Sequence, residues 1–254
     1  MIPYPLWGLH PNQLKVGLIS CWEFNESSGT DLFDVYGGLD FTNVGCKVNQ
    51  TGILDKAYNF DGTNDRCEYN TNNNDLSPQA NHSTSMWFKR LGDSAADTGS
   101  SLLSKYYSSA GLRIYYRALY ATTHATLDNQ LRHSYWDTTN TSTDLYYDPG
   151  SDIWTDNWKH VVFTREGNSL KTYVNAVEVA GGTGGNGSMQ QTTHSAVEDM
   201  IGAVSKSSTV PDTFFEGLID QTASWNVALS RGQVSALYNN GSGLAYTSWN
   251  DVFF

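Results

Sequence analysis

The sequence is poor in basic residues and has no long apolar run. Only 15 of its 254 residues are Lys or Arg, against 26 Asp or Glu, which gives a formal net charge of −11. Proteins that bind nucleic acid need a basic patch to neutralise phosphates, so we expect no nucleic-acid partner. A membrane-spanning helix needs roughly 18 consecutive apolar residues, and no such window occurs, so we expect no membrane span.

Cysteine is also scarce. Cys21, Cys46 and Cys67 are an odd number and show no Cys-x-x-Cys spacing, so the sequence predicts neither a zinc site nor a complete set of disulfides. Buried free thiols are the simplest interpretation. A bridge between Cys21 and Cys67 stays open, because both lie in predicted strands that could be neighbours.

Motifs for covalent catalysis are missing as well. The chain contains no Gly-x-Ser-x-Gly and no His-Glu-x-x-His, which are the signatures of nucleophilic hydrolases and zinc proteases. The adjacent acids Glu198 and Asp199 would point to opposite faces of a strand. The glycine-rich segment 181–187 lacks the Lys-Ser/Thr ending of a phosphate loop, so we interpret it as a strand connection.

The chain does contain many short segments with the pattern of strands. Residues 158–180 hold runs rich in Val, Tyr, Phe and Thr, and a turn candidate at Asn175–Ala176 reverses the chain, which predicts a β-meander. Val161 and Phe163 would face one side of the first strand and Val162 the other. Apolar residues on both sides predict a central strand inside a layered structure.

These segments resemble those of a known family. A Trp-polar-His-Val strand followed by Tyr-Val-Asn is similar to the strand pair of laminin-G-like, concanavalin A-like domains, and further segments follow in that family's order between residues 17 and 246. They are Leu18–Gly29, Phe33–Gly38, Ala57–Tyr69, Ser83–Lys89, Phe214–Gln221 and Trp225–Ser230. The resemblance implies an all-β fold, an antiparallel two-sheet jelly-roll sandwich. At position 176 the family commonly has Gly, and a type I′ turn would force Ala176 to positive φ.

One helix is predicted near the carboxyl end. Ser230 and Gln233 form a Ser-x-x-Gln capping box, Val234 and Leu237 follow at helical spacing, and Asn240–Gly241 is a stop signal. The predicted organisation is an extended amino-terminal arm at residues 1–16 and one laminin-G-like jelly-roll domain at residues 17–254.

The arm is unusual in composition. Residues 1–14 contain three prolines and no charged side chain, so the arm should run extended. It is nevertheless too apolar for a solvated linker. Two interpretations remain, packing across its own sandwich or docking on a partner protein. The docking candidates are Ile2, Tyr4, Leu6, Trp7 and Leu9.

A calcium site is implied by the resemblance, because laminin-G-like domains often bind calcium at the rim of the sandwich. Asp34 and Asp220 match the positions of the family's usual carboxylates, and hard cations prefer several such oxygens. The family's Ile-Asp-Glu is Ile-Asp-Gln here, which removes one negative charge. The alternative is that both aspartates bond their own backbone in turns.

A glycan site is suggested by segment 102–154, where Tyr and Trp alternate with Asn, Asp and Thr. Aromatic rings stack on the apolar face of a sugar while polar groups take its hydroxyls. The candidates are Trp136, Tyr146 and Tyr147, and the two tyrosines lie beyond the predicted strands. The alternative is that these aromatics are ordinary strand residues.

Three functions follow from these patterns. The first is a non-catalytic structural or adhesion protein of a virus particle, such as a phage capsid decoration or tail fibre. It would dock on virion proteins through its arm, belong to a homo-oligomer or symmetric assembly, lie on the virion surface and contact host glycans. The second is an extracellular lectin module. The third, a glycoside hydrolase, is disfavoured because the Glu-x-Asp-x-x-Glu array of related glucanases is missing.

Overall fold

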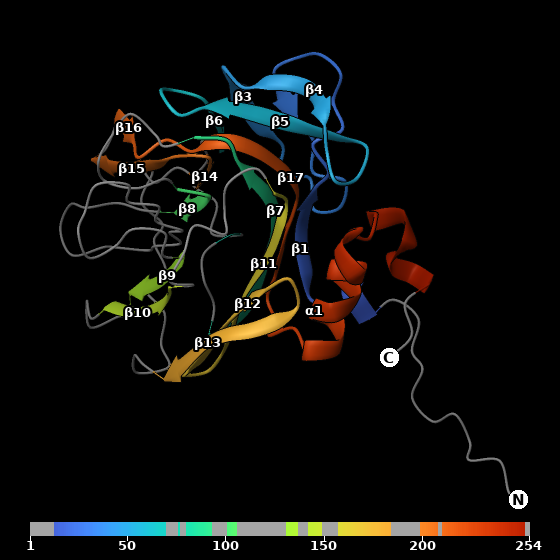
Figure 1. Ribbon diagram of the computed structural model, residues 1–254, viewed down its shortest axis with the longest axis vertical. Coiled ribbons are helices and arrows are strands. Elements are labelled where there is room, and N and C mark those ends of the chain that lie inside the picture. Colours follow the sequence, from blue (N-terminus) through green and yellow to red (C-terminus); the bar gives the residue numbers. More distant parts are fainter. Residues whose placement is uncertain are drawn as a thin grey trace, which may run out of the picture.

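The computed structural model has two packed layers of antiparallel strands (Figure 1). It describes residues 13–69, 76, 80–92, 101–105, 131–136, 142–148, 157–183, 199–207 and 210–251. The all-β sandwich and the single short α-helix near the carboxyl end are confirmed. The boundary between arm and domain stays a prediction, since residues 1–12 lie outside the described residues.

The larger sheet has the strand order β13-β12-β11-β7-β17-β5-β4, and β1 pairs with β17 beside this path. All its pairs are antiparallel. Its strands are β1 (Leu18–Trp22), β4 (Lys47–Thr51), β5 (Lys56–Asp61), β7 (Asn81–Arg90), β11 (Lys159–Glu166), β12 (Ser169–Val174), β13 (Val177–Thr183) and β17 (Glu216–Trp225). The predicted meander therefore corresponds to β11, β12 and β13.

The second layer contains a sheet of order β2-β3-β6-β14-β8 and two separate hairpins, β9–β10 and β15–β16. The sheet strands are β2 (Asp31–Leu32), β3 (Phe41–Val44), β6 (Arg66–Tyr69), β8 (Leu103–Lys105) and β14 (Asp199–Ile201). The hairpin strands are β9 (Leu131–Trp136), β10 (Ser142–Tyr147), β15 (Val204–Ser207) and β16 (Val210–Asp212). The β9–β10 hairpin packs over β12 and β13.

The side chains of β11 alternate between two hydrophobic clusters. Val161 and Phe163 belong to the cluster between the layers, and Val162 belongs to the cluster on the outer face of the larger sheet. Successive side chains of a strand point to opposite faces, so β11 contributes to both clusters. This confirms that it is a central strand, with β7 on one edge and β12 on the other.

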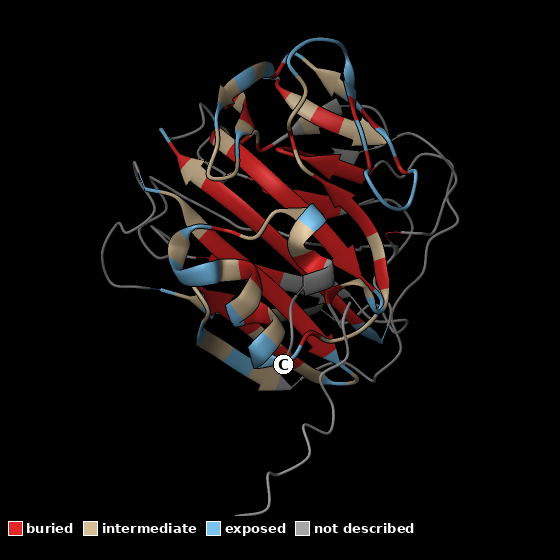
Figure 2. Cartoon of the chain, turned by 90° about the vertical axis from the view of Figure 1, so that its right-hand side faces the viewer, coloured by how far each residue is buried: buried red, intermediate tan, exposed pale blue. Residues whose placement is uncertain are grey.

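The outer face of the larger sheet is covered by helical segments (Figure 2). They are η1 (Gln13–Lys15), α1 (Arg231–Tyr238), η2 (Asn239–Gly241) and η3 (Tyr246–Asp251). The Ser230–Gln233 capping box of α1 is formed as predicted, and Asn239 ends the helix in the left-handed conformation. Leu14, Trp225 and Trp249 are fully buried in this outer cluster.

The turn between β12 and β13 has the positive φ angles of a type I′ turn. Asn175 has φ of 49° and Ala176 has φ of 63°, and both values lie in the left-handed region that a type I′ hairpin turn requires. Ala at this position carries a steric cost that Gly does not. The sequence-based expectation for this turn is therefore confirmed.

Substituting Ala176→Gly should stabilise the protein by about 0.4–1 kcal/mol, because the strain at positive φ outweighs the greater freedom of Gly in the unfolded chain. Chemical denaturation measures this difference. Val179→Gly, within β13, is the control and should destabilise, since Gly weakens a strand interior. An unchanged or lowered stability of Ala176→Gly would contradict the strain argument.

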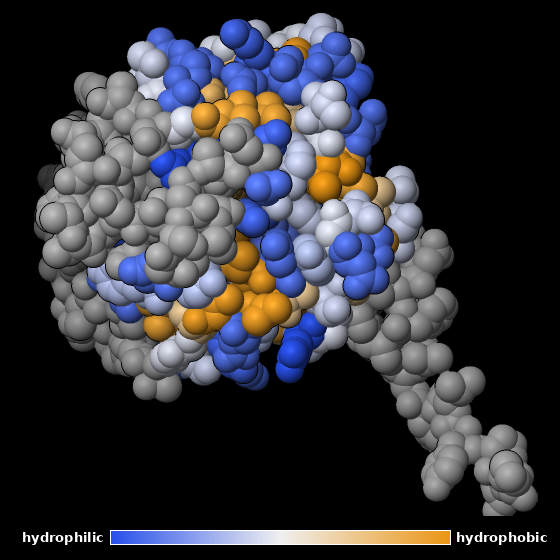
Figure 3. Space-filling model, in the orientation of Figure 1, coloured by the Kyte–Doolittle hydropathy of each residue, from blue (hydrophilic) through white to orange (hydrophobic). Residues whose placement is uncertain are grey.

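All three cysteines are buried free thiols. Cys21 lies in the outer cluster and Cys67 in the cluster between the layers, so the larger sheet separates them and the bridge that the sequence left open is not formed. On the face drawn in Figure 3, hydrophobic residues reach the surface in separate groups bordered by hydrophilic ones. Among the described residues, no helix has the length and apolar character needed to cross a bilayer.

Candidate functional site

Strand β17 changes its neighbour on one edge at Asp220 and Gln221. Residues 216–219 pair with β5, and residues 222–225 pair with β1. On the other edge the pairing with β7 shifts register between Asp220 and Ala223, and Gln221 has φ of 39°. Such a bulge bends the strand and re-aims its side chains. Asp220 therefore lies where the ends of β5 and β1 leave a gap.

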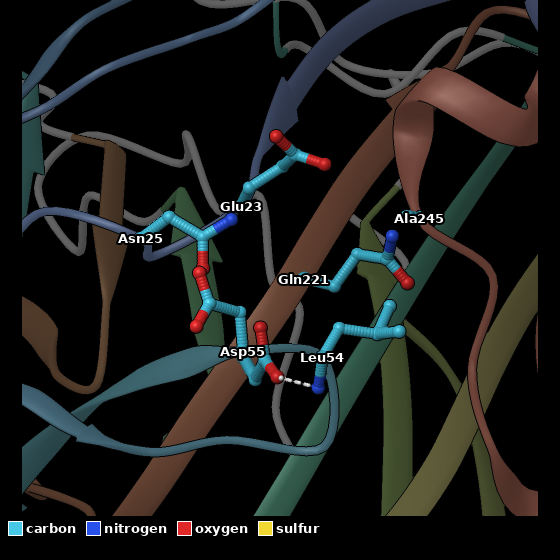
Figure 4. Close-up of a pocket in the computed structure, with 7 residues that line it drawn as sticks. Glu23, Asn25, Leu54, Asp55, Gln221 and Ala245 are labelled. Atoms are coloured by element: carbon cyan, nitrogen blue, oxygen red, sulfur yellow. Dashed lines mark hydrogen bonds between the residues drawn. The ribbon is translucent and has the colours of Figure 1, made fainter.

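A cavity of about 150 Å³ occupies this gap. We call it the junction cavity. Its lining comes from the residues after β1, the β4–β5 turn, β17 and the segment that follows α1, and the side chains converge from these four places (Figure 4). The lining residues are Glu23, Asn25, Leu54, Asp55, Asp220, Gln221 and Ala245.

Asp220 ties the β4–β5 turn to β17. Its Oδ2 atom accepts hydrogen bonds from the backbone N–H groups of Ile53 and Leu54, both at 2.9 Å. Gly52 permits this approach, since a Cβ atom there would lie 2.6 Å from Oδ2. The residue is fully buried, and its Oδ1 atom has no hydrogen-bond partner among the described residues. Burial raises the pKa of Asp220 to about 8, although the backbone N–H bonds act to lower it.

Asp34 organises a different loop. Its Oδ1 atom accepts hydrogen bonds from the backbone N–H groups of Cys21, Tyr36 and Gly37 at 2.9–3.0 Å. Its Oδ2 atom accepts one from Leu39 at 3.0 Å. The carboxylate thus satisfies four backbone donors and fixes the connection between β2 and β3. This is the backbone-bonded arrangement that the sequence left open as the alternative to metal binding.

The two predicted calcium ligands take part in different hydrogen-bond networks. Asp34 does not line the junction cavity, and its two oxygens accept four backbone hydrogen bonds. Within the described residues, no three His, Cys, Asp or Glu side chains gather closely enough to hold a metal ion. Calcium binding by Asp34 and Asp220 stays a prediction.

The β9–β10 hairpin presents Tyr146 to solvent. This residue is 45% exposed, and the guanidinium carbon of Arg132 lies 5.3 Å from the centroid of its ring. Arg132 also binds Asp144 through two hydrogen bonds, at 3.2 Å and 2.8 Å. We call these three residues the hairpin face. Paired charges hold Arg132 beside the ring, which gives a pre-positioned aromatic surface with polar groups at its edge.

The other predicted glycan residues are placed differently. Tyr147 packs against the cluster between the layers, on the opposite side of β10 from Tyr146, so the two tyrosines do not form one surface. Trp136 pairs with Ser142 at the end of the hairpin, and its side chain lies outside the described part of the structure. The docking candidates Ile2, Tyr4, Leu6, Trp7 and Leu9 also lie outside the described residues.

Sequence reasoning missed two aromatic residues close to the junction cavity. Tyr246 follows the lining residue Ala245, and its backbone N–H donates to Oε1 of Glu23 at 3.2 Å. Its ring meets that of Tyr36 edge to face, with 6.4 Å between the centroids. Tyr36 is 47% exposed. These residues are more than 200 positions apart in the sequence, so no local pattern could have joined them.

The family can now be assigned from sequence. A profile described as the concanavalin A-like lectin/glucanases superfamily matches residues 61–235, which is more than half of the chain. The chain belongs to this superfamily. Comparison with curated protein sequences finds no match.

Several solved structures resemble this superfamily member at low sequence identity. Domain 4 of AbnA, a GH43 extracellular arabinanase from Geobacillus stearothermophilus solved with arabinotriose, has a TM-score of 0.59 and 19% identity, covering 86% of this chain and 96% of the domain. The binding domain of botulinum neurotoxin serotype D has a TM-score of 0.61 and 15% identity, covering 88% of this chain and 51% of that one. Trypanosoma rangeli sialidase in complex with sialic acid has a TM-score of 0.62 and 14% identity, covering 91% of this chain and 34% of the sialidase. The chain thus spans about half of the neurotoxin domain and a third of the sialidase.

Proposed function

We propose that this concanavalin A-like domain is a non-catalytic adhesion module that binds glycans through the hairpin face. The observation that carries the proposal is the exposed ring of Tyr146, held beside the Arg132–Asp144 pair. A sugar ring could stack on the aromatic surface while the charged groups bind its hydroxyls. Structural relatives solved with arabinotriose or sialic acid support a role in carbohydrate recognition.

A non-catalytic role is proposed because the sequence lacks the motif for the pair of carboxyl groups that glycosidases generally use. Hydrolysis of a glycosidic bond generally needs two carboxyl groups that flank the bond, and the sequence lacks the strand motif that supplies them in related glucanases. On the hairpin face the one carboxylate, Asp144, is paired with Arg132. That arrangement serves to orient groups for binding.

Tyr146→Ala should weaken glycan binding by about tenfold, because an aromatic contact of this kind contributes about 1.4 kcal/mol. A glycan array followed by calorimetry on the strongest ligand measures the loss. Val177→Ala is the matched control, since Val177 is an apolar residue that is 59% exposed on β13. Unchanged affinity of Tyr146→Ala, or an array without any bound glycan, would contradict the proposed site.

We further propose that the module is a component of a virus particle, attached through its amino-terminal arm. Leu14 is fully buried in the outer cluster, and its carbonyl oxygen accepts a hydrogen bond of 2.6 Å from Nε1 of Trp225. Lys15 lies 4.1 Å above the ring of Tyr246. The arm is therefore rooted on the outer face of the larger sheet, whereas the hairpin packs on the inner face (Figure 1). Attachment on one side would leave the hairpin face accessible on the other.

Deleting residues 1–12 should abolish attachment to the partner particle while the domain keeps its melting temperature. The deletion must end there, because removing Leu14 would open the outer cluster. Co-sedimentation with assembled particles tests attachment. A truncated protein that still co-sediments would rule out docking through the arm, whereas the substitution Val16→Ala, at a residue that is 62% exposed just after η1, should leave attachment unchanged.

A further inference from the structure

We infer that the junction cavity, together with the exposed ring of Tyr36, is a second glycan site that takes the neutral terminal sugar residue of a glycan chain. This inference rests on the proposed glycan-binding function and adds a separate site and a ligand class. Four observations support it, namely the unsatisfied groups in the cavity, its size, its charge and its aromatic border.

The cavity offers groups that match sugar hydroxyls. The Oδ1 atom of fully buried Asp220 has no partner among the described residues, and a buried polar atom of this kind favours a ligand or water that forms a hydrogen bond with it. Asn25 uses its Oδ1 atom to accept from the backbone of Lys56, so its amide nitrogen remains as a donor. Gln221 uses its Nε2 atom to bind the carbonyl of Leu244, so its oxygen remains as an acceptor.

The size of the cavity selects a single ring. A cavity of about 150 Å³ holds a molecule the size of benzene, so it can admit at most part of one sugar ring. Asp55 is exposed, and Asn25, Leu54 and Ala245 are half-buried, so the mouth reaches solvent and part of a ring could enter while the rest of the glycan stays outside. Leu54 and Ala245 add apolar surface for the ring carbons.

The charge of the cavity selects a neutral sugar. Glu23 and Asp55 are acidic, and no Lys or Arg is among the described residues that line it. Like charges in a partly buried site repel one another. A sugar that carries a carboxylate, such as sialic acid, is therefore disfavoured relative to a neutral aldose.

A pair of aromatic residues, the aromatic border, adjoins the lining residues Glu23 and Ala245 through Tyr246. The backbone N–H of Tyr246 donates a hydrogen bond to Glu23, and the ring of Tyr246 contacts the ring of Tyr36. Because Lys15 covers the Tyr246 ring, the exposed Tyr36 ring is the surface left for stacking. The four hydrogen bonds to Asp34 hold the Tyr36 loop in place, so little conformational entropy is lost when a sugar binds.

Saturation-transfer NMR with free L-arabinose, D-galactose and N-acetylneuraminic acid tests the site. We expect at least one neutral sugar to bind the wild type. The signal of the acidic sugar should be the same for the wild type and for the two cavity variants below. Ala245→Phe fills the cavity, and Tyr36→Ala removes the exposed ring without touching the backbone bonds of its loop. Each should weaken binding of the neutral sugar by about tenfold, while Val177→Ala should have no effect.

The outcomes separate this inference from the proposed function. If Ala245→Phe and Tyr36→Ala bind the neutral sugar as well as the wild type, the second site is overturned, and a loss confined to Tyr146→Ala would leave the hairpin face as the glycan site. If only acidic glycans bind on the array, the proposed glycan-binding function is supported and the neutral-sugar site in the junction cavity is overturned. If Ala245→Phe lowers the melting temperature, the Tyr36→Ala result alone decides, because that side chain is exposed.

Discussion

Replacing Asp34 with alanine should lower the free energy of unfolding by about 2–6 kcal/mol. The substitution leaves four backbone N–H groups without their acceptor. Those of Tyr36 and Gly37 lie in an exposed loop and can bind water. Those of Cys21 and Leu39 are buried, and each buried donor left unsatisfied costs about 1–3 kcal/mol.

Chemical denaturation in EDTA and in excess calcium measures this loss and separates two roles of Asp34. An equal loss under both conditions would show that the carboxylate stabilises the loop through its hydrogen bonds. A loss that appears only with calcium would instead identify a metal ligand. Asp40→Ala is the control, since it removes a single hydrogen bond, from the backbone N–H of Asp34, and should cost about 1 kcal/mol.

The second large effect concerns Asp220 and pH. The pKa of this carboxyl is about 8 in the folded protein, against an ordinary value of 3.8, so folding takes up a proton between these values. Its contribution to stability is therefore fully present below about pH 4 and is lost as the pH rises towards 8. At 1.36 kcal/mol per pKa unit, the loss is up to about 6 kcal/mol.

Asp220→Asn mimics the protonated carboxyl at every pH. We expect this variant to match the wild type near pH 4 and to be more stable by several kcal/mol at pH 8, because it has no proton to take up. Thermal melts at pH 4, 6 and 8 provide the measurement. Parallel pH profiles of the two proteins would contradict the raised pKa.

Calcium can be tested on the same pair of proteins. A cation bound to Asp220 would stabilise the ionised carboxylate, so excess calcium would raise the melting temperature of the wild type at pH 8 and leave that of Asp220→Asn unchanged. Equal melting temperatures in EDTA and in calcium for both proteins would remove the predicted metal site.

Much of the fold could be predicted because its signals are local. The meander 158–180, its Asn175–Ala176 turn and the capping box of α1 each depend on residues within a few positions of one another. Strand β10 was missed, because Ser142–Tyr147 carries polar residues in its first half and resembles a loop. Its pairing with β9 supplies the order that the local sequence does not indicate.

The candidate sites were less predictable, because they depend on which distant residues meet. Asp34 and Asp220 were paired by family resemblance, yet each binds backbone N–H groups of a different loop. Tyr146 and Tyr147 are adjacent in sequence and point to opposite sides of β10. The junction cavity forms only because β17 changes partner from β5 to β1, a feature that no motif encodes.

That change of partner also has a consequence for how the protein acquires its structure. Strand β17 pairs with β5 and β1 on one edge and with β7 on the other. The side chain of Trp225 forms a hydrogen bond with the carbonyl of Leu14, which lies 211 positions away in the chain. Closing such a long loop before any contact can form makes folding slow. During synthesis, β1, β5 and β7 therefore keep unpaired edges until residues 216–225 have left the ribosome, and this interval is when the chain is most prone to aggregate.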